Sequence, residues 1–127
     1  MASRDLTKLE EAVMRMLLDG DDSSLRILRQ QFAKASLHSR EMTGVGFYTT
    51  FALPEDIERL PGNPRISFGD VEATMPSLQH GACFVLWIID SRLNVLEGYT
   101  YDEPWPEETD SFTLVYISEI RDLSPLH

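Results

Sequence analysis

Residues 82–89 read ACFVLWII, which is the longest apolar run in the chain. Alternate side chains of a strand point to opposite faces, so both faces of this strand would be apolar, as is typical of a strand covered on both sides. The run is too short to cross a bilayer as a helix, which takes about twenty residues. It therefore predicts a buried strand at the centre of a sheet.

The residues after this run predict that the chain turns back and pairs with it. Asp90-Ser91-Arg92 forms a short turn, and residues 93–101 then make an antiparallel hairpin with residues 82–89. Pro104 and Pro106 impose an irregular loop, because proline cannot donate a hydrogen bond to a ladder. Residues 112–117 are expected to supply the last strand.

Residues 45–53 alternate with period two, which predicts another strand, and Pro54 ends it. Residues 36–42 are expected to pair with this strand through a turn near Thr43-Gly44. Their alternation is weaker, so the pairing rests on the turn.

The stretch between these strands and the central run is expected to be a connection and then an extended segment. Residues 54–60 have the composition of one helical turn, which residues 61–64 then break. Residues 66–75 are predicted to be extended, with Gly69 as a bulge that changes which side chains face the core.

Two amphipathic helices are predicted before the strands, at about residues 5–19 and 23–35. In the first, apolar side chains recur at three-four spacing, Thr7 and Glu10 form a capping box, and Gly20 is placed as a stop. Residues 21–23 carry acceptor side chains that suit the N-cap of the second helix.

These elements predict a single α+β domain over residues 1–127, with strands from about 36 to 118. Two amphipathic helices must bury their apolar sides against another element. We therefore expect them to pack on one face of a mainly antiparallel sheet of five or six strands.

Charge is distributed unevenly along the chain. Residues 1–50 carry seven acidic and seven basic side chains, whereas residues 51–127 carry fourteen acidic and four basic ones. Binding to a phosphate backbone draws its energy from cations, so this composition argues against nucleic acid as a partner. The same field favours a basic protein, because complementary charge speeds encounter.

The acidic excess is densest between residues 97 and 110, where no Lys or Arg occurs. Carboxylates mixed with Tyr and Trp are typical of a partner-binding surface, because large aromatic side chains dominate interface hot spots. The alternative is that the tyrosines pack on the sheet and the tryptophan pins the proline loop onto it. The predicted partner-binding residues are Glu97, Tyr99, Tyr101, Asp102, Glu103, Trp105, Glu107, Glu108 and Asp110.

Catalytic patterns are weak. Cys83 lies three residues from His80, but in an extended segment that spacing puts the two side chains on opposite faces. Glu97, Asp102 and Glu103 could act as the acid and base of a small hydrolase, as in acid-rich clefts of glycosidases. A solvated acidic rim is the alternative that we favour, and we expect no catalytic residue.

No cofactor or metal site is expected. His38, His80 and His127 belong to no zinc-binding pattern, and residues 19–23 lack the glycine and glutamate of a calcium loop. Gly44-Val45-Gly46 is followed by no phosphate-binding pattern.

The start of the chain predicts a cytoplasmic protein that does not enter membranes. Asp5, Glu10 and Glu11 fall where a secretory signal would need a basic and then an apolar region. The single cysteine, Cys83, excludes an internal disulfide and fits a reducing compartment.

One part of the chain resembles known proteins. His80-Gly81-Ala82, followed by the apolar strand and then by residues 96–106 (LEGYTYDEPWP), resembles the closing hairpin of small uncharacterised bacterial proteins. In size, acidity and helix-then-sheet order, the chain is also similar to immunity proteins, which neutralise a cognate toxin domain in the cytoplasm. That similarity implies a role and no residue assignments.

Three functions follow as hypotheses. The first is a non-enzymatic acidic protein-binding module, such as an immunity protein that neutralises a basic toxin domain. The second is a small accessory protein similar to a secretion chaperone, which would hold an extended client against the sheet and dimerise. The third is the small hydrolase. The sequence leaves open whether the protein is a monomer or a homodimer.

Overall fold

Two helices precede a seven-stranded antiparallel sheet in the computed structural model, which describes residues 4–62 and 65–126. Within the sheet the strand order is β1-β2-β6-β5-β4-β7, and β3 also pairs with β5. The elements are α1 (Lys8–Leu17), α2 (Ser23–Ala33), β1 (Ser36–Met42), β2 (Gly46–Ala52), β3 (Arg65–Phe68), β4 (Val71–Thr74), β5 (Ala82–Ile89), β6 (Arg92–Thr100), β7 (Thr113–Tyr116) and the short 3-10 helix η1 (Ser124–Leu126).

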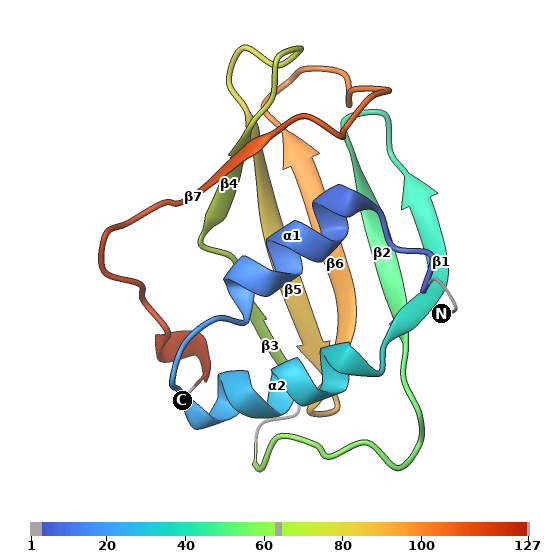
Figure 1. Ribbon diagram of the computed structural model, residues 1–127, viewed down its shortest axis with the longest axis vertical. Helices are drawn as coiled ribbons and strands as arrows, with labels where there is room; N and C mark the ends of the chain where they lie inside the picture. The colour runs from blue at the N-terminus through green and yellow to red at the C-terminus, as the bar shows by residue number, and fades with distance from the viewer. Residues whose placement is uncertain (1–3, 63–64, 127) are drawn as a thin grey trace.

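The α+β class is confirmed, and both helices lie across the same face of the sheet (Figure 1). The described residues form seven strands where five or six were expected, because the segment predicted at 66–75 is divided into β3 and β4. Both of these strands pair with β5, one after the other along its length.

The division at Gly69 changes which side chains face the core. Ile66 and Phe68 are buried before it and Val71 is buried after it, so the buried positions pass from even to odd numbers. A Cβ on Gly69 would lie 1.9 Å from the carbonyl oxygen of Phe84. Glycine is therefore needed where the chain crosses close to β5, and the predicted change of face is confirmed.

The predicted central strand is confirmed as β5, which pairs with β6 along one edge and with β3 and β4 along the other. Asp90 and Ser91 join β5 to β6, with φ angles of 55° and 63°. Positive φ at both central residues is the conformation of a type I′ hairpin turn, whose twist matches that of paired strands.

Both predicted helices are present and are shorter than expected. The capping box of Thr7 and Glu10 is confirmed, and it starts α1 at Lys8. Asp22 caps α2 by accepting from the amide of Ser24 at 2.8 Å. No helix in the described ranges, 4–62 and 65–126, is long and apolar enough to span a membrane.

One helical turn was expected in residues 54–60, and the structure forms one hydrogen-bonded turn there without a helix. The amide of Ile57 donates to the carbonyl of Pro54 at 3.3 Å, which closes a single turn that does not continue as a helix. Ile57 and Leu60 are instead buried and tie this connection to the core. Asn63 and Pro64 of the predicted break lie outside the described residues.

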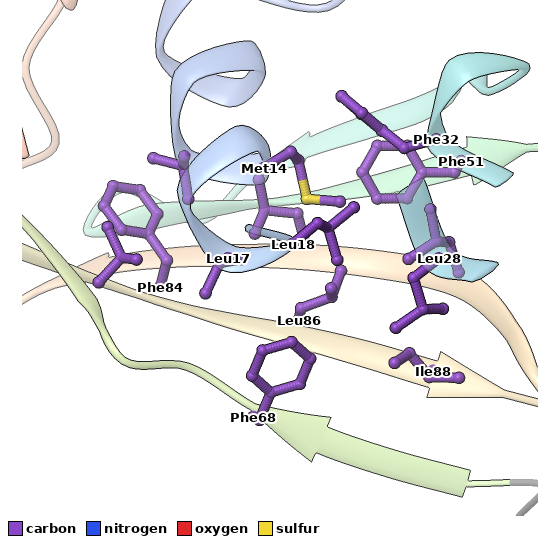
Figure 2. Close-up of a cluster of buried hydrophobic side chains, with 14 of the residues drawn as sticks. Met14, Leu17, Leu18, Leu28, Phe32, Phe51, Phe68, Phe84, Leu86 and Ile88 are labelled. Atoms are coloured by element: carbon purple, nitrogen blue, oxygen red, sulfur yellow. The ribbon is translucent and has the colours of Figure 1, made fainter. Parts of the chain in front are cut away.

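The core lies between the helices and the sheet, as Figure 2 shows. Met14 and Leu17 of α1, together with Leu18 at its C-cap, point towards Phe84 and Leu86 of β5. Each fully buried aliphatic or aromatic side chain of this kind contributes about 1.5–3 kcal/mol to folding through removal from water. The helices are thereby fixed on one face.

No helix of the described segments covers the opposite face of the sheet, and we call it the open face. Cross-strand partners point to the same side of a sheet, so the pairing registers identify its members. The open face is formed by Ser36, Ser39, Glu41, Tyr48, Thr50, Ala52, Arg65, Ser67, Glu72, Thr74, Cys83, Val85, Trp87, Ile89, Arg92, Val95, Glu97, Tyr99, Thr113 and Val115.

Candidate partner-binding site

The segment after β6 is a loop at one end of the sheet, and we call residues 101–110 the acidic rim. Backbone hydrogen bonds hold it against the turn between β1 and β2. The amide of Thr100 donates to Val45 and the amide of Trp105 donates to Gly44, both at 2.9 Å. The irregular loop forced by Pro104 and Pro106 is thus anchored close to Gly44, and it crosses the top of Figure 1.

Trp105 fixes the rim to the core. Its ring meets the ring of Phe47 edge to face, with centroids 5.2 Å apart, and the side chain is half-buried. An aromatic pair of this geometry contributes about 0.5–1.5 kcal/mol beyond the area that it buries. Trp105 therefore pins the proline loop to the sheet while leaving part of the indole at the surface.

Glu103 connects the rim to the loop between β4 and β5. Its carboxylate accepts from the amides of Gln79 and His80 at 2.8 Å and 3.0 Å. These two hydrogen bonds favour the charged form, and they lower the pKa of Glu103 from its ordinary value.

We expect the amide signals of Gln79 and His80 to move with pH at a midpoint below 4.5, the ordinary value for glutamate. Because the pKa of Glu103 is lowered in the folded state, the stabilisation from these two hydrogen bonds is fully present at neutral pH. It is lost as the pH falls through that lowered pKa. Two-dimensional NMR between pH 2.5 and 7 measures the midpoint. Glu103→Gln should abolish this transition, and an unchanged transition in the variant would contradict the assignment.

The rest of the acidic rim faces solvent. Glu107, Glu108 and Asp110 are exposed, and the Glu108 carboxylate accepts from the amide of Asp110. Lys8 at the start of α1 donates to the carbonyl oxygen of Asp110 at 3.1 Å and lies 5.7 Å from the ring of Phe112. This cation contacts the end of the rim and leaves the carboxylates of Glu107 and Glu108 outward.

A cavity of about 330 Å³ opens beside the rim, between α1, β1, β2 and the loop. Apolar side chains form much of its wall, and Glu107 is part of its edge. Its lining residues are Thr7, Leu9, Glu10, Arg40, Met42, Gly44, Phe47, Trp105, Pro106, Glu107 and Thr109.

A buried ion pair forms the inner wall of this cavity. The Glu10 carboxylate is 1% exposed and accepts from two nitrogens of Arg40, at 2.6 Å and 3.0 Å. It also accepts from the amide of Thr7 at 2.8 Å and from the hydroxyl of Thr49. Hydrogen bonding to Glu10 raises the pKa of Arg40, so the guanidinium stays charged.

This network was missed by reasoning from the sequence. Thr7 and Glu10 were recognised as a capping box, but the partner strand of Glu10 was not. The available signal was Thr49, a polar side chain in the middle of the alternating apolar positions Phe47 and Phe51. A buried hydroxyl in such a row requires a partner, and Glu10 supplies it.

Of the nine predicted residues, Trp105 and Glu107 line the cavity beside the acidic rim, and Glu97, Tyr99 and Tyr101 lie on or next to the open face. Glu97 and Tyr99 lie on the open face, where Glu97 accepts from the indole nitrogen of Trp87 at 3.3 Å. Tyr101 shares a hydrogen bond of 2.8 Å with the thiol of Cys83, and its ring meets that of Tyr99 at 6.0 Å. The predicted surface is thus divided between the open face and the acidic rim.

The Tyr101 phenol is perturbed by this contact. The hydrogen bond with Cys83 and the nearby thiol raise the pKa of Tyr101 to about 12. The phenol is therefore neutral throughout the physiological range. Its ring remains half exposed at the first residue of the acidic rim, where it contacts Cys83 and Tyr99 of the open face.

The arrangement gives little support to carboxylate catalysis. Glu97 and Glu103 are each engaged by donors, and neither they nor Asp102 line the cavity beside Trp105. Across residues 4–62 and 65–126, no group of three His, Cys, Asp or Glu side chains is placed to hold a metal ion.

The functional assignment rests on the residues described above, because comparison with known proteins adds nothing to it. No family model, curated protein or solved structure matches the chain.

Proposed function

We propose that this protein is a non-enzymatic acidic protein-binding module that uses the acidic rim to hold a basic partner. The observation that carries the proposal is the exposed carboxylate of Glu107 at a cavity lined by Phe47 and Trp105, with the exposed Glu108 as the next residue of the loop. A Lys or Arg side chain combines an apolar stem with a cationic end. Such a side chain fits a cavity in which Phe47 and Trp105 offer apolar contact and Glu107 offers a carboxylate.

The proposed biological role is that of an immunity protein in the bacterial cytoplasm, with a basic toxin domain as the partner. The chain carries a formal net charge of −10, which steers a cationic protein towards it. The rim is held by Glu103 and Trp105 before any partner arrives, so little ordering of the loop is required on binding.

Reversal of charge at the rim is the test. Affinity capture from a lysate of the native host, with the product of the neighbouring gene tested directly, supplies the partner. Glu107→Lys combined with Glu108→Lys is expected to weaken binding roughly tenfold or more and to flatten its dependence on salt. Isothermal titration calorimetry at several salt concentrations measures both effects.

Glu55→Lys combined with Asp56→Lys is the matched control, because it makes the same change in net charge. Both residues are exposed in the connection after β2, at the other end of the sheet (Figure 1). We expect the control to retain most of the affinity. Equal losses in the two variants would show that overall charge, and not the acidic rim, governs binding.

The chaperone-like function is the second candidate, and the open face is the observation that favours it. An extended client would lie against Trp87, Val95 and Tyr99, which no helix covers. The two candidate functions differ in the surface that the bound protein covers. A basic partner would cover the acidic rim, and an extended client would cover the open face.

A further inference from the structure

The open face has too many large apolar side chains to be an ordinary solvated face of an antiparallel sheet. Val85, Trp87 and Ile89 of β5 and Val95 of β6 lie there side by side and are only half-buried. A sheet face that meets water normally carries polar residues at these positions. A contiguous apolar face of this kind indicates an interaction surface.

Charges on the open face are separated along the strands. Glu72 pairs with Cys83, and Glu97 pairs with Val85, so both carboxylates lie towards the start of β5. Arg65 and Arg92 both pair with Ile89 at its end. Four to six residues of strand separate the two groups, which corresponds to about 13–20 Å.

The two arginines have no ion-pair partner among the residues that the structure describes. In the described ranges, no ion pair involves Arg65 or Arg92, or the carboxylates of Glu72 or Glu97. A uniformly basic partner laid over the whole face would meet both arginines. The occupant of this face must therefore carry both signs of charge.

A second copy of the chain meets this requirement in one arrangement. When two identical sheets pack face to face, the two-fold axis can run along the strands or across them. An axis along the strands places carboxylates over carboxylates. An axis across them, near Leu86, reverses the strands and places Arg65 over Glu72 and Arg92 over Glu97.

We propose that the protein is a homodimer in which the two open faces pack on each other with their strands antiparallel. The apolar side chains of β5 and β6 form the centre of the interface, and the two arginine–glutamate pairs on each side set its direction. The acidic rims then lie at opposite ends of the dimer and remain exposed. This inference does not depend on the proposed function, since the acidic rim takes no part in the interface.

Exchange of the charges gives the test. We expect sedimentation equilibrium to show a dimer for the unchanged protein, and dimer affinity to fall roughly tenfold or more in Glu97→Arg and in Arg92→Glu. Each variant places like charges opposite each other. An equimolar mixture of the two variants restores both opposite-charge contacts and is expected to regain dimer formation, as is the double variant in one chain.

The control is Arg26→Glu, which makes the same charge change as Arg92→Glu on an exposed position of α2 and should leave the dimer intact. Circular dichroism verifies that each variant is folded. A monomer at concentrations of several hundred micromolar, a dimer that survives both single reversals, or a mixture that stays monomeric would each overturn the inference.

Discussion

Glu10→Ala is expected to lower the free energy of unfolding by about 3–5 kcal/mol, measured by urea denaturation at fixed protein concentration. The Glu10 carboxylate is held by Arg40, Thr7 and Thr49 inside the protein. Its removal leaves the fully buried hydroxyl of Thr49 without its acceptor and the Arg40 guanidinium without its counter-charge. It also removes one half of the capping box of α1, which itself contributes about 1 kcal/mol.

Glu11→Ala is the matched control for Glu10. Glu11 is the next residue of α1 and pairs with Arg4 at 2.7 Å, but both side chains are about a quarter to a third exposed. A pair of this kind contributes about 0–1 kcal/mol. Similar losses for the two variants would contradict the buried position of Glu10.

Phe84→Ala is expected to cost about 3–5 kcal/mol, because it opens a cavity between β5 and the helices. The Phe84 side chain is 2% exposed and points towards Leu17 of α1 (Figure 2). The adjacent residue, Val85, is the control, since it lies on the open face and is only partly buried. Val85→Ala should cost a fraction of that loss in the monomer.

The same denaturation measurement separates the two faces of β5. It is best made on the dimer-breaking Glu97→Arg background, so that the open face is uncovered in all samples. A loss at Val85 as large as that at Phe84 would show that a further part of the protein covers the open face.

Sequence patterns predicted the fold class well because hydrophobic periodicity and turn residues report local structure directly. The run at 82–89 gave β5, and Thr7 with Glu10 gave the start of α1. The weak strand at 36–42 was also confirmed, since a tight turn fixes its partner. At residues 54–60 the structure forms a single hydrogen-bonded turn without a helix, and Ile57 and Leu60 are buried in this connection.

Long-range contacts of polar side chains were beyond these patterns. Gln31 of α2 is fully buried, donates to the carbonyls of Glu58 and Ser91, and accepts from the amide of Leu93. Nothing in its neighbours along the chain distinguishes it from a surface glutamine. The pairing of Glu10 with Arg40 depends in the same way on the fold as a whole.

For the acidic and aromatic residues 97–110, the sequence predicted the composition of the surface but not the direction of each side chain. The composition of residues 97–110 was visible, but the side to which each residue turns depends on where β6 ends. Glu97 and Tyr99 remain in the strand and point to the open face, whereas Trp105 lies beyond Pro104 and folds back on Phe47. Successive side chains point to opposite faces of the sheet only in the strand, so the directions of the side chains after Thr100 could not be predicted from alternation.

The position of a bound partner tests the central claim most directly. Hydrogen–deuterium exchange of the free protein and of its complex with the captured basic partner maps the protected amides. We predict new protection in residues 101–112 and in the turn between β1 and β2, with β5 and β6 unchanged. Protection confined to β5 and β6, or to α2, with residues 101–112 exchanging as in the free protein, would contradict the assignment of the acidic rim as the docking site.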